Sequence, residues 1–166
     1  MARFLRLHPP LMLFSLLMAA LTVVSLGGLI VDDRILVGSP IWFKPFKFAV
    51  SLCLYGVTLA WMLTLTTRLR RTGWWAGAVI ALAGTAEMAV IVGQVLRGRR
   101  SHFNVATPFD DLLWDVMTYS ILTLWIMHAV IAVALAFTRF ENRATGLAIR
   151  LGLVLSLVGL ALGTLM

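Results

Sequence analysis

The sequence has 166 residues, of which 61% are apolar and 13% are charged, and its net charge is +7. A water-soluble domain carries about 45–50% apolar and about 25% charged residues, so this composition excludes a soluble globular fold. The basic residues lie in short clusters between apolar runs, where positive-inside topology and lipid headgroups account for them. We therefore expect membrane lipids, and not nucleic acid, as partners.

Five apolar stretches are long enough to cross a bilayer, which needs about 20 residues per helix. In chain order they cover residues 11–31, 46–66, 74–96, 112–137 and 147–166. The first stretch is longer than the apolar region of a signal peptide, and no A-x-A-like cleavage site follows it, so we interpret it as a retained helix. The sequence predicts an all-α fold, an integral membrane bundle of five transmembrane helices in a single domain.

The basic residues between the stretches predict an orientation, because they concentrate on the cytoplasmic side. With the N-terminus inside, the inner segments hold eight: Arg3, Arg6, Arg68, Arg70, Arg71, Arg139, Arg143 and Arg150. The outer segments hold six: Arg34, Lys44, Lys47, Arg97, Arg99 and Arg100. This difference favours a cytoplasmic N-terminus. In either orientation, the segment between the first two helices and the loop 97–111 lie at the same membrane face.

The second stretch carries a polar stripe of Lys47, Ser51, Tyr55 and Thr58 at helical spacing, so all four share one face. Lipid offers no hydrogen-bond partner, and we expect the stripe to face the bundle interior. Hydrogen bonding between helices is the alternative role for the two hydroxyl residues.

The third stretch carries Glu87, with Gln94 two turns later on the same face. An intramembrane carboxylate costs at least about 2.5 kcal/mol unless it is paired or protonated. Glu87 is therefore predicted to be a proton carrier, an ion ligand or an acid/base group. A structural pair with Lys47, or a hydrogen bond to Tyr55, is the alternative.

The loop 97–111 is dense in groups that bind anions or move protons. Three arginines on a predicted outer face run against the positive-inside trend, which favours a role in binding phosphate or carboxylate. Thr107 followed by Pro108 and two acids predicts a helix start with Thr107 as N-cap. Capping accounts for much of the signal at Asp110 without any catalysis.

The histidines do not indicate a cofactor site. His128 lies roughly 24 Å beyond the start of the fourth stretch, so its depth does not match that of His102. This mismatch argues against a bis-histidine haem, and no metal site or other cofactor is assigned. We interpret His128 as a buried polar group bonded to a neighbour.

Two pairs of glycines have the spacing that lets helix backbones approach closely. Gly73 and Gly77 begin the third stretch, and Gly159 and Gly163 lie in the fifth. Packing inside the bundle is the first interpretation of both pairs. A homo-oligomer formed through Gly159 and Gly163 is the second.

Two segments carry a resemblance to a known group. The K-P-F-K-F segment that begins at Lys44 and the R-G-x-x-S-H-F-N-x-x-T-P-F-D segment that begins at Arg97 resemble those of an uncharacterised family of small bacterial polytopic membrane proteins. The resemblance spans the second to fourth helices. It implies a bacterial inner-membrane location and supplies no substrate.

The leading functional hypothesis is a binding or transport protein with an outward-facing polar site for a small ligand, ion or lipid headgroup. In it, Glu87 exchanges a proton or pairs with a cation, and the loop arginines hold an anionic group. The expected binding residues are Lys44, Lys47, Tyr55, Glu87, Gln94, Arg97, Arg100, Ser101 and Asn104.

Two other hypotheses remain open. The first is an intramembrane enzyme acting on a lipid or isoprenoid phosphate. In that enzyme, His102 would be the general acid/base, Asp110 or Asp111 its orienting or metal-binding partner, and Arg97 or Arg100 the phosphate clamp. The second is a structural subunit of a membrane complex that docks through the last helix.

Overall fold

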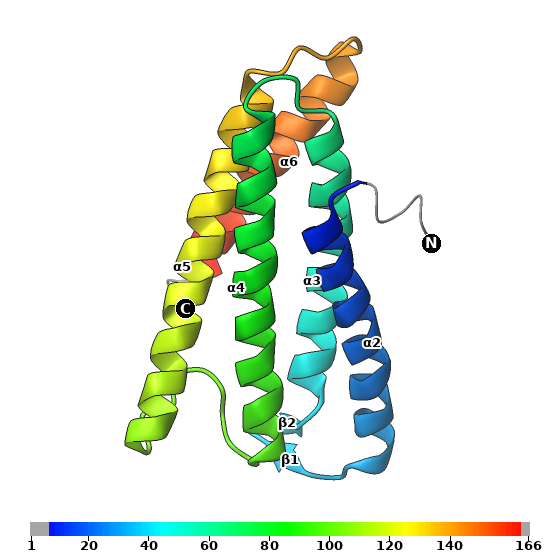
Figure 1. The fold of residues 1–166 in the computed structure, drawn as a ribbon. Helices are drawn as coiled ribbons and strands as arrows, with labels where there is room; N and C mark the ends of the chain where they lie inside the picture. The colour runs from blue at the N-terminus through cyan, green and yellow to red at the C-terminus, as the bar shows by residue number, and fades with distance from the viewer. Residues whose placement is uncertain (1–6, 164–166) are drawn as a thin grey trace.

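The computed structural model describes residues 7–163, through which five helices and one short hairpin run (Figure 1). The elements are α2 (Pro9–Val31), β1 (Ile35–Leu36), β2 (Ser39–Pro40), α3 (Phe43–Thr64), α4 (Arg70–Leu96), α5 (Pro108–Ala136) and α6 (Arg143–Gly163). Each described helix is long and apolar enough to cross a membrane, which confirms the predicted all-α bundle. Arg3 and Arg6 of the orientation count, and the predicted helix end at Met166, lie outside the described residues.

The helices begin two to four residues before the apolar stretches. At α2, His8 is the N-cap, and its side chain accepts a hydrogen bond from the Leu11 amide. At α5, Thr107 accepts from the Asp110 amide and Pro108 is the first helical residue, as predicted. An apolar stretch marks only the part of a helix that lies in the hydrocarbon region of the bilayer. The hydrogen bonding of the helix continues beyond it into the polar interface.

The central helix of the bundle is α4, which packs along α5 and also contacts α2 and α3 (Figure 1). A Cβ on Gly77 would lie 2.9 Å from His8 Nε2, and one on Gly73 would lie 3.0 Å from Leu63 Cδ2. Packing inside the bundle is therefore confirmed for this pair. By contrast, a Cβ on Gly159 would meet nothing within 4 Å. The predicted internal packing is wrong there, because α6 lies at the edge of the bundle and packs chiefly on α5.

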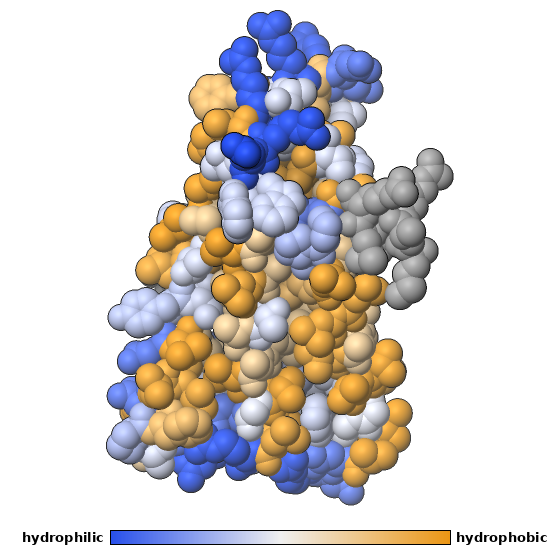
Figure 2. Space-filling model, in the orientation of Figure 1, coloured by the Kyte–Doolittle hydropathy of each residue, from blue (hydrophilic) through white to orange (hydrophobic). Residues whose placement is uncertain are grey.

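Hydrophilic side chains gather at the two ends of the molecule, with a mostly hydrophobic band between them (Figure 2). The β1–β2 hairpin and the loop between α4 and α5 lie at one end (Figure 1). We call this the hairpin end. The prediction that these two segments share a face is confirmed, since Lys44 at the start of α3 bonds His102 in the loop.

Three of the four residues in the polar stripe on α3 do not face the interior as predicted. Lys47, Ser51 and Thr58 are exposed. The Ser51 hydroxyl donates to the Lys47 carbonyl at 3.0 Å, and the Thr58 hydroxyl donates to the Leu54 carbonyl at 2.7 Å. Because each hydroxyl finds a partner on its own helix, neither needs the bundle interior.

Tyr55 is the member of the stripe that bonds across the bundle. Its hydroxyl lies 2.7 Å from His128 Nδ1, and the two rings stack. The expected bond from Tyr55 to Glu87 is therefore wrong. The interpretation of His128 as a buried group bonded to a neighbour is confirmed.

Candidate functional site

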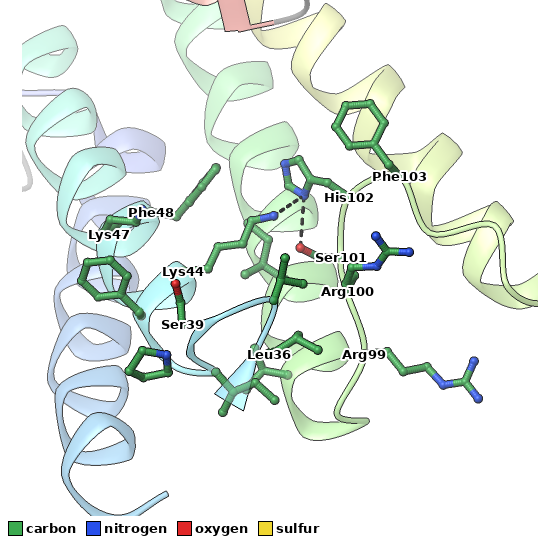
Figure 3. A pocket seen from close by; sticks show the side chains of 16 residues that line it. Leu36, Ser39, Lys44, Lys47, Phe48, Arg99, Arg100, Ser101, His102 and Phe103 are labelled. Atoms are coloured by element: carbon green, nitrogen blue, oxygen red, sulfur yellow. Dashed lines mark hydrogen bonds between the residues drawn. The ribbon is translucent and has the colours of Figure 1, made fainter. Parts of the chain in front are cut away.

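A cavity of about 450 Å³ opens at the hairpin end, between the hairpin, the start of α3, the end of α4 and the following loop (Figure 3). Four cationic side chains line it, together with Ser39, Ser101 and His102. The four are Lys44, Lys47, Arg99 and Arg100. No carboxylate of residues 7–163 is among its walls. We call it the basic cavity, and its volume lies within the range of small-molecule sites, about 300–1,000 Å³.

One wall of the basic cavity is the hairpin, which Asp32 ties to the end of α2. The Asp32 carboxylate accepts hydrogen bonds from the Arg34 guanidinium and from Trp42 Nε1, both at 2.7 Å. These bonds hold the pKa of Asp32 well below its usual range. Trp42 in turn packs on Gly28, where no side chain would fit. The hairpin therefore has a fixed position beside α3.

Lys44 and Ser101 converge on His102 (Figure 3). Lys44 Nζ lies 2.9 Å from His102 Nδ1, and the Ser101 hydroxyl lies 3.1 Å from the same nitrogen. An ammonium group only donates, so Nδ1 is the acceptor and the ring hydrogen is on Nε2. Burial, and secondarily the charge of Lys44, lowers the pKa of His102 to about 4. His102 is therefore neutral at pH 7.

Behind the basic cavity, Asp110 is the centre of a hydrogen-bonded network. Its Oδ1 accepts from Gln94 at 3.0 Å and from Arg97 at 2.7 Å. Its Oδ2 accepts from Arg99 at 2.6 Å and from Thr107 at 2.7 Å. Asp110 is 0% exposed because these partners cover it, although it lies at the edge of the bundle. The network ties the end of α4, the loop and the start of α5 together.

A second cavity, of about 470 Å³, adjoins the first and reaches α5 and α6. Its walls are mostly apolar: Phe48, Phe103, Trp114, Met117, Ile121 and Leu160, with Gly159, Thr118, His102 and Glu87. We call it the apolar cavity. Phe48, His102 and Phe103 line both cavities.

Glu87 is 4% exposed and lines the apolar cavity. Within residues 7–163 its carboxyl group has no hydrogen bond and no ion pair closer than 4.0 Å. The positive charge that acts on it is that of Lys44. The alternative interpretation of Glu87 as the partner of Lys47 is wrong, because the Lys47 ammonium lies over the Phe43 ring, 4.6 Å from its centre, and forms no ion pair with a described carboxylate.

The structure divides the expected site residues into several groups. Lys44, Lys47, Arg100, Ser101 and His102 line the basic cavity.

Gln94, Arg97 and Asp110 belong to the network, and Tyr55 bonds His128. Asn104 shapes the loop by donating to the Arg100 carbonyl at 2.9 Å. The side chain of Asp111 is exposed.

The cavity residues that sequence reasoning did not name individually include Ser39, Phe48, Arg99 and Trp114. Arg99 belongs to the same basic run as Arg97 and Arg100, and the run does not indicate which of its members faces inward. Phe48 and Trp114 are apolar, so the sequence does not distinguish them from residues that face lipid. Phe48 carried one usable signal, since it follows Lys44 by one helical turn.

The fold and the cavities define the class as a multi-pass helical membrane protein. In the part of the chain that the structure describes, no three His, Cys, Asp or Glu side chains gather as a set of metal ligands. No protein-family model, curated protein or solved structure matches the chain.

Proposed function

We propose that the protein binds a small anionic group, of the phosphate-ester type, in the basic cavity. The observation that carries the proposal is an excess of cationic side chains over carboxylates in the walls of the cavity. Lys44, Lys47 and Arg100 form no ion pair with any described residue. No described carboxylate lines the cavity. Cationic side chains that line one cavity without a carboxylate among them attract an anion.

Binding accounts for the cavity better than catalysis does. The enzyme hypothesis needs a carboxylate to orient His102, but both oxygens of Asp110 are occupied by other donors. The neighbour that does orient His102 is Lys44. A histidine whose pKa is about 4 is a weak base at pH 7. The geometry thus favours a site that holds its ligand.

The location of the site follows from the positive-inside interpretation and from the family resemblance. We place the N-terminus in the cytoplasm of a bacterium and the hairpin end at the outer face of the inner membrane. A ligand would then reach the basic cavity from the outer leaflet or from the solution beside it. Cysteine labelling at Val37, an exposed residue of the hairpin turn, tests this orientation in intact cells.

The test of the binding proposal compares two lipids with identical chains, dioleoyl phosphatidic acid and dioleoyl phosphatidylcholine, by native mass spectrometry in mild detergent. Wild type is expected to bind the phosphatidic acid selectively. A Lys44→Gln/Arg100→Gln double variant should lose about 10-fold or more of that affinity, since hydrogen bonds to charged groups are worth about 1.5–3 kcal/mol each.

The matched control is Arg70→Gln/Arg71→Gln, which removes two exposed charges from the start of α4, at the opposite end of the bundle. It should leave the affinity unchanged. Equal affinity of the double variant and wild type would overturn the proposal.

Coupling of this binding to a proton is a second candidate, which the environment of Glu87 favours. Glu87 is a buried carboxyl group without a hydrogen bond to any described residue, and Lys44 is the cation that acts on it. An anion that draws Lys44 toward the basic cavity would leave Glu87 without its opposite charge, and a proton would replace that charge.

Proton coupling is testable with dioleoyl phosphatidylglycerol, whose charge does not change between pH 5.5 and 7. Binding should weaken as the pH rises in wild type and become independent of pH in Glu87→Gln. His102, with a pKa of about 4, stays neutral over this range. Unaltered pH dependence in the variant would count against the coupling.

A further inference from the structure

We propose that the basic and apolar cavities form one site for a single anionic amphiphile, whose headgroup lies in the basic cavity and whose hydrocarbon chain lies in the apolar cavity. This inference rests on the proposed function and names the class of ligand. A free water-soluble anion would need the first cavity alone.

The two cavities are continuous along a shared wall. Phe48, His102 and Phe103 line both of them. In Figure 3 these three residues lie along the side of the basic cavity away from the hairpin. Lys44 contacts this wall directly, since its ammonium bonds His102 and lies 5.9 Å from the centre of the Phe48 ring. An anion held by Lys44 is therefore placed beside the entrance to the apolar cavity.

The chemistry of the two linings changes across that wall. On one side are four cationic side chains. On the other are Trp114, Met117, Ile121 and Leu160, which offer apolar surface. A charged head joined to an apolar chain is the ligand that satisfies both sides at once. The volumes, about 450 and about 470 Å³, leave space for both parts.

The apolar cavity owes part of its space to Gly159. A Cβ at this position would meet nothing within 4 Å. The helix that carries it, α6, packs chiefly on α5 at the edge of the bundle. A chain in the surrounding bilayer can therefore reach the cavity beside α6 without displacing a helix of the bundle core.

The different linings fix the direction of the ligand. A negative headgroup in the apolar cavity would meet no cationic side chain among the walls that the structure describes, whereas the same headgroup in the basic cavity meets cations. Cations in one cavity and not in the other select one orientation. The chain itself gains little hydrophobic free energy on leaving the bilayer, because lipid tails are as apolar as the cavity wall. Discrimination between ligands with the same headgroup therefore depends on whether the hydrocarbon chain fits the apolar cavity.

Filling the apolar cavity is the direct test. Gly159→Leu adds a side chain where the structure has open space. The matched control is Gly152→Leu, on the same helix, where a Cβ also meets nothing within 4 Å and which lines neither cavity. A second filling variant is Thr118→Phe in α5, since Thr118 lines the apolar cavity and its hydroxyl donates to the Trp114 carbonyl of its own helix.

The probes share a headgroup and differ in the chain: 1-oleoyl lysophosphatidic acid and sn-glycerol 3-phosphate. Both filling variants should bind the lysophosphatidic acid about 10-fold more weakly, because a chain forced into a filled cavity meets steric overlap. Their affinity for glycerol 3-phosphate should not change. Gly152→Leu should bind both probes as wild type does.

The outcomes separate this inference from the proposed function. Full lysophosphatidic acid affinity in both filling variants, with loss in Lys44→Gln/Arg100→Gln, would overturn the chain site and leave the anion site standing. Full affinity in the charge variant would overturn both proposals. If Gly159→Leu instead dissociates an oligomer while lipid binding is retained, the cavity belongs to a second copy of the chain, and the chain site is again overturned.

Discussion

Two clusters of charge meet at the loop between α4 and α5, and they differ in how completely their charges are satisfied. Around Asp110, two arginines, a glutamine and a threonine supply four donors to two carboxylate oxygens. Around Lys44, the acceptor of the ammonium is a neutral histidine nitrogen. A saturated cluster holds a loop in place, and an unsaturated one retains the capacity to bind. The basic residues of the two clusters look alike in the sequence, but one cluster holds the loop in place and the other is available to bind a ligand.

The two clusters also depend on each other. Arg99 pairs with Asp110 at 2.6 Å and at the same time lines the basic cavity. The Asp110 network therefore positions the loop residues Arg100, Ser101 and His102, which complete the cavity. Loss of the network should disturb the cavity, whereas loss of a cavity charge should leave the network intact.

The largest effect is expected from Asp110→Asn. An asparagine oxygen cannot receive all four donors, and two partly exposed arginines would lose the buried carboxylate that they share. The thermal unfolding midpoint in detergent should fall by about 10 °C. The control is Asp111→Asn, which removes an exposed neighbouring charge and should change the midpoint little. Equal midpoints for the two variants would contradict the structural role of Asp110.

The next largest effects come from substitutions at two arginines of the loop, one of which should change stability and the other binding. Arg97→Gln should lower the unfolding midpoint, by less than Asp110→Asn does, because Arg99 still pairs with Asp110. Its effect on phosphatidic acid binding should be small. Arg100→Gln should weaken that binding several-fold, by about 1 kcal/mol, and leave the midpoint unchanged.

Thermal scans and native mass spectrometry on the same preparations measure both quantities. The comparison of the two clusters fails if the two variants lose stability and affinity in the same proportion.

The smallest effect concerns the pH dependence of stability. The pKa of His102 is about 4 in the folded protein and near 6.5 in an unfolded chain. Between these values the unfolded state binds the proton more readily, so the stability that neutral His102 contributes is complete above pH 6.5 and is lost as the pH falls toward 4.

Unfolding midpoints at pH 7.5 and pH 4.5 should therefore differ more in wild type than in His102→Gln. His8→Asn is the informative control, because burial also lowers the pKa of His8 but this residue lies at the other end of the bundle, where it bonds the Trp74 carbonyl. Its removal should leave the His102 part of the pH dependence in place. An identical pH response of His102→Gln and wild type would show that the ring is not held neutral by its surroundings.

Much of the fold was predictable because it depends on properties that accumulate along the chain. Five long apolar stretches require five helices in a bilayer. A single segment that crosses the bilayer can satisfy its backbone hydrogen bonds internally only as an α-helix. Alternation of the spans then puts the hairpin and the loop 97–107 at one face. The helix start at Thr107 and Pro108 was readable because capping involves only neighbouring residues.

The tertiary structure decided which side of each helix meets which neighbour. Sequence periodicity places Lys44 and Lys47 near each other on α3, and only packing turns Lys44 toward His102 and leaves Lys47 over the Phe43 ring. Rotation of α3 likewise leaves Ser51 and Thr58 exposed, where their own helix satisfies them. The sequence by itself determined how many helices there are, which segments cross the membrane and how apolar each one is, because these properties depend on local composition. The pairing of Asp110, the space at Gly159 and the joined cavities depend on how helices rotate and separate, which only contacts between distant residues decide.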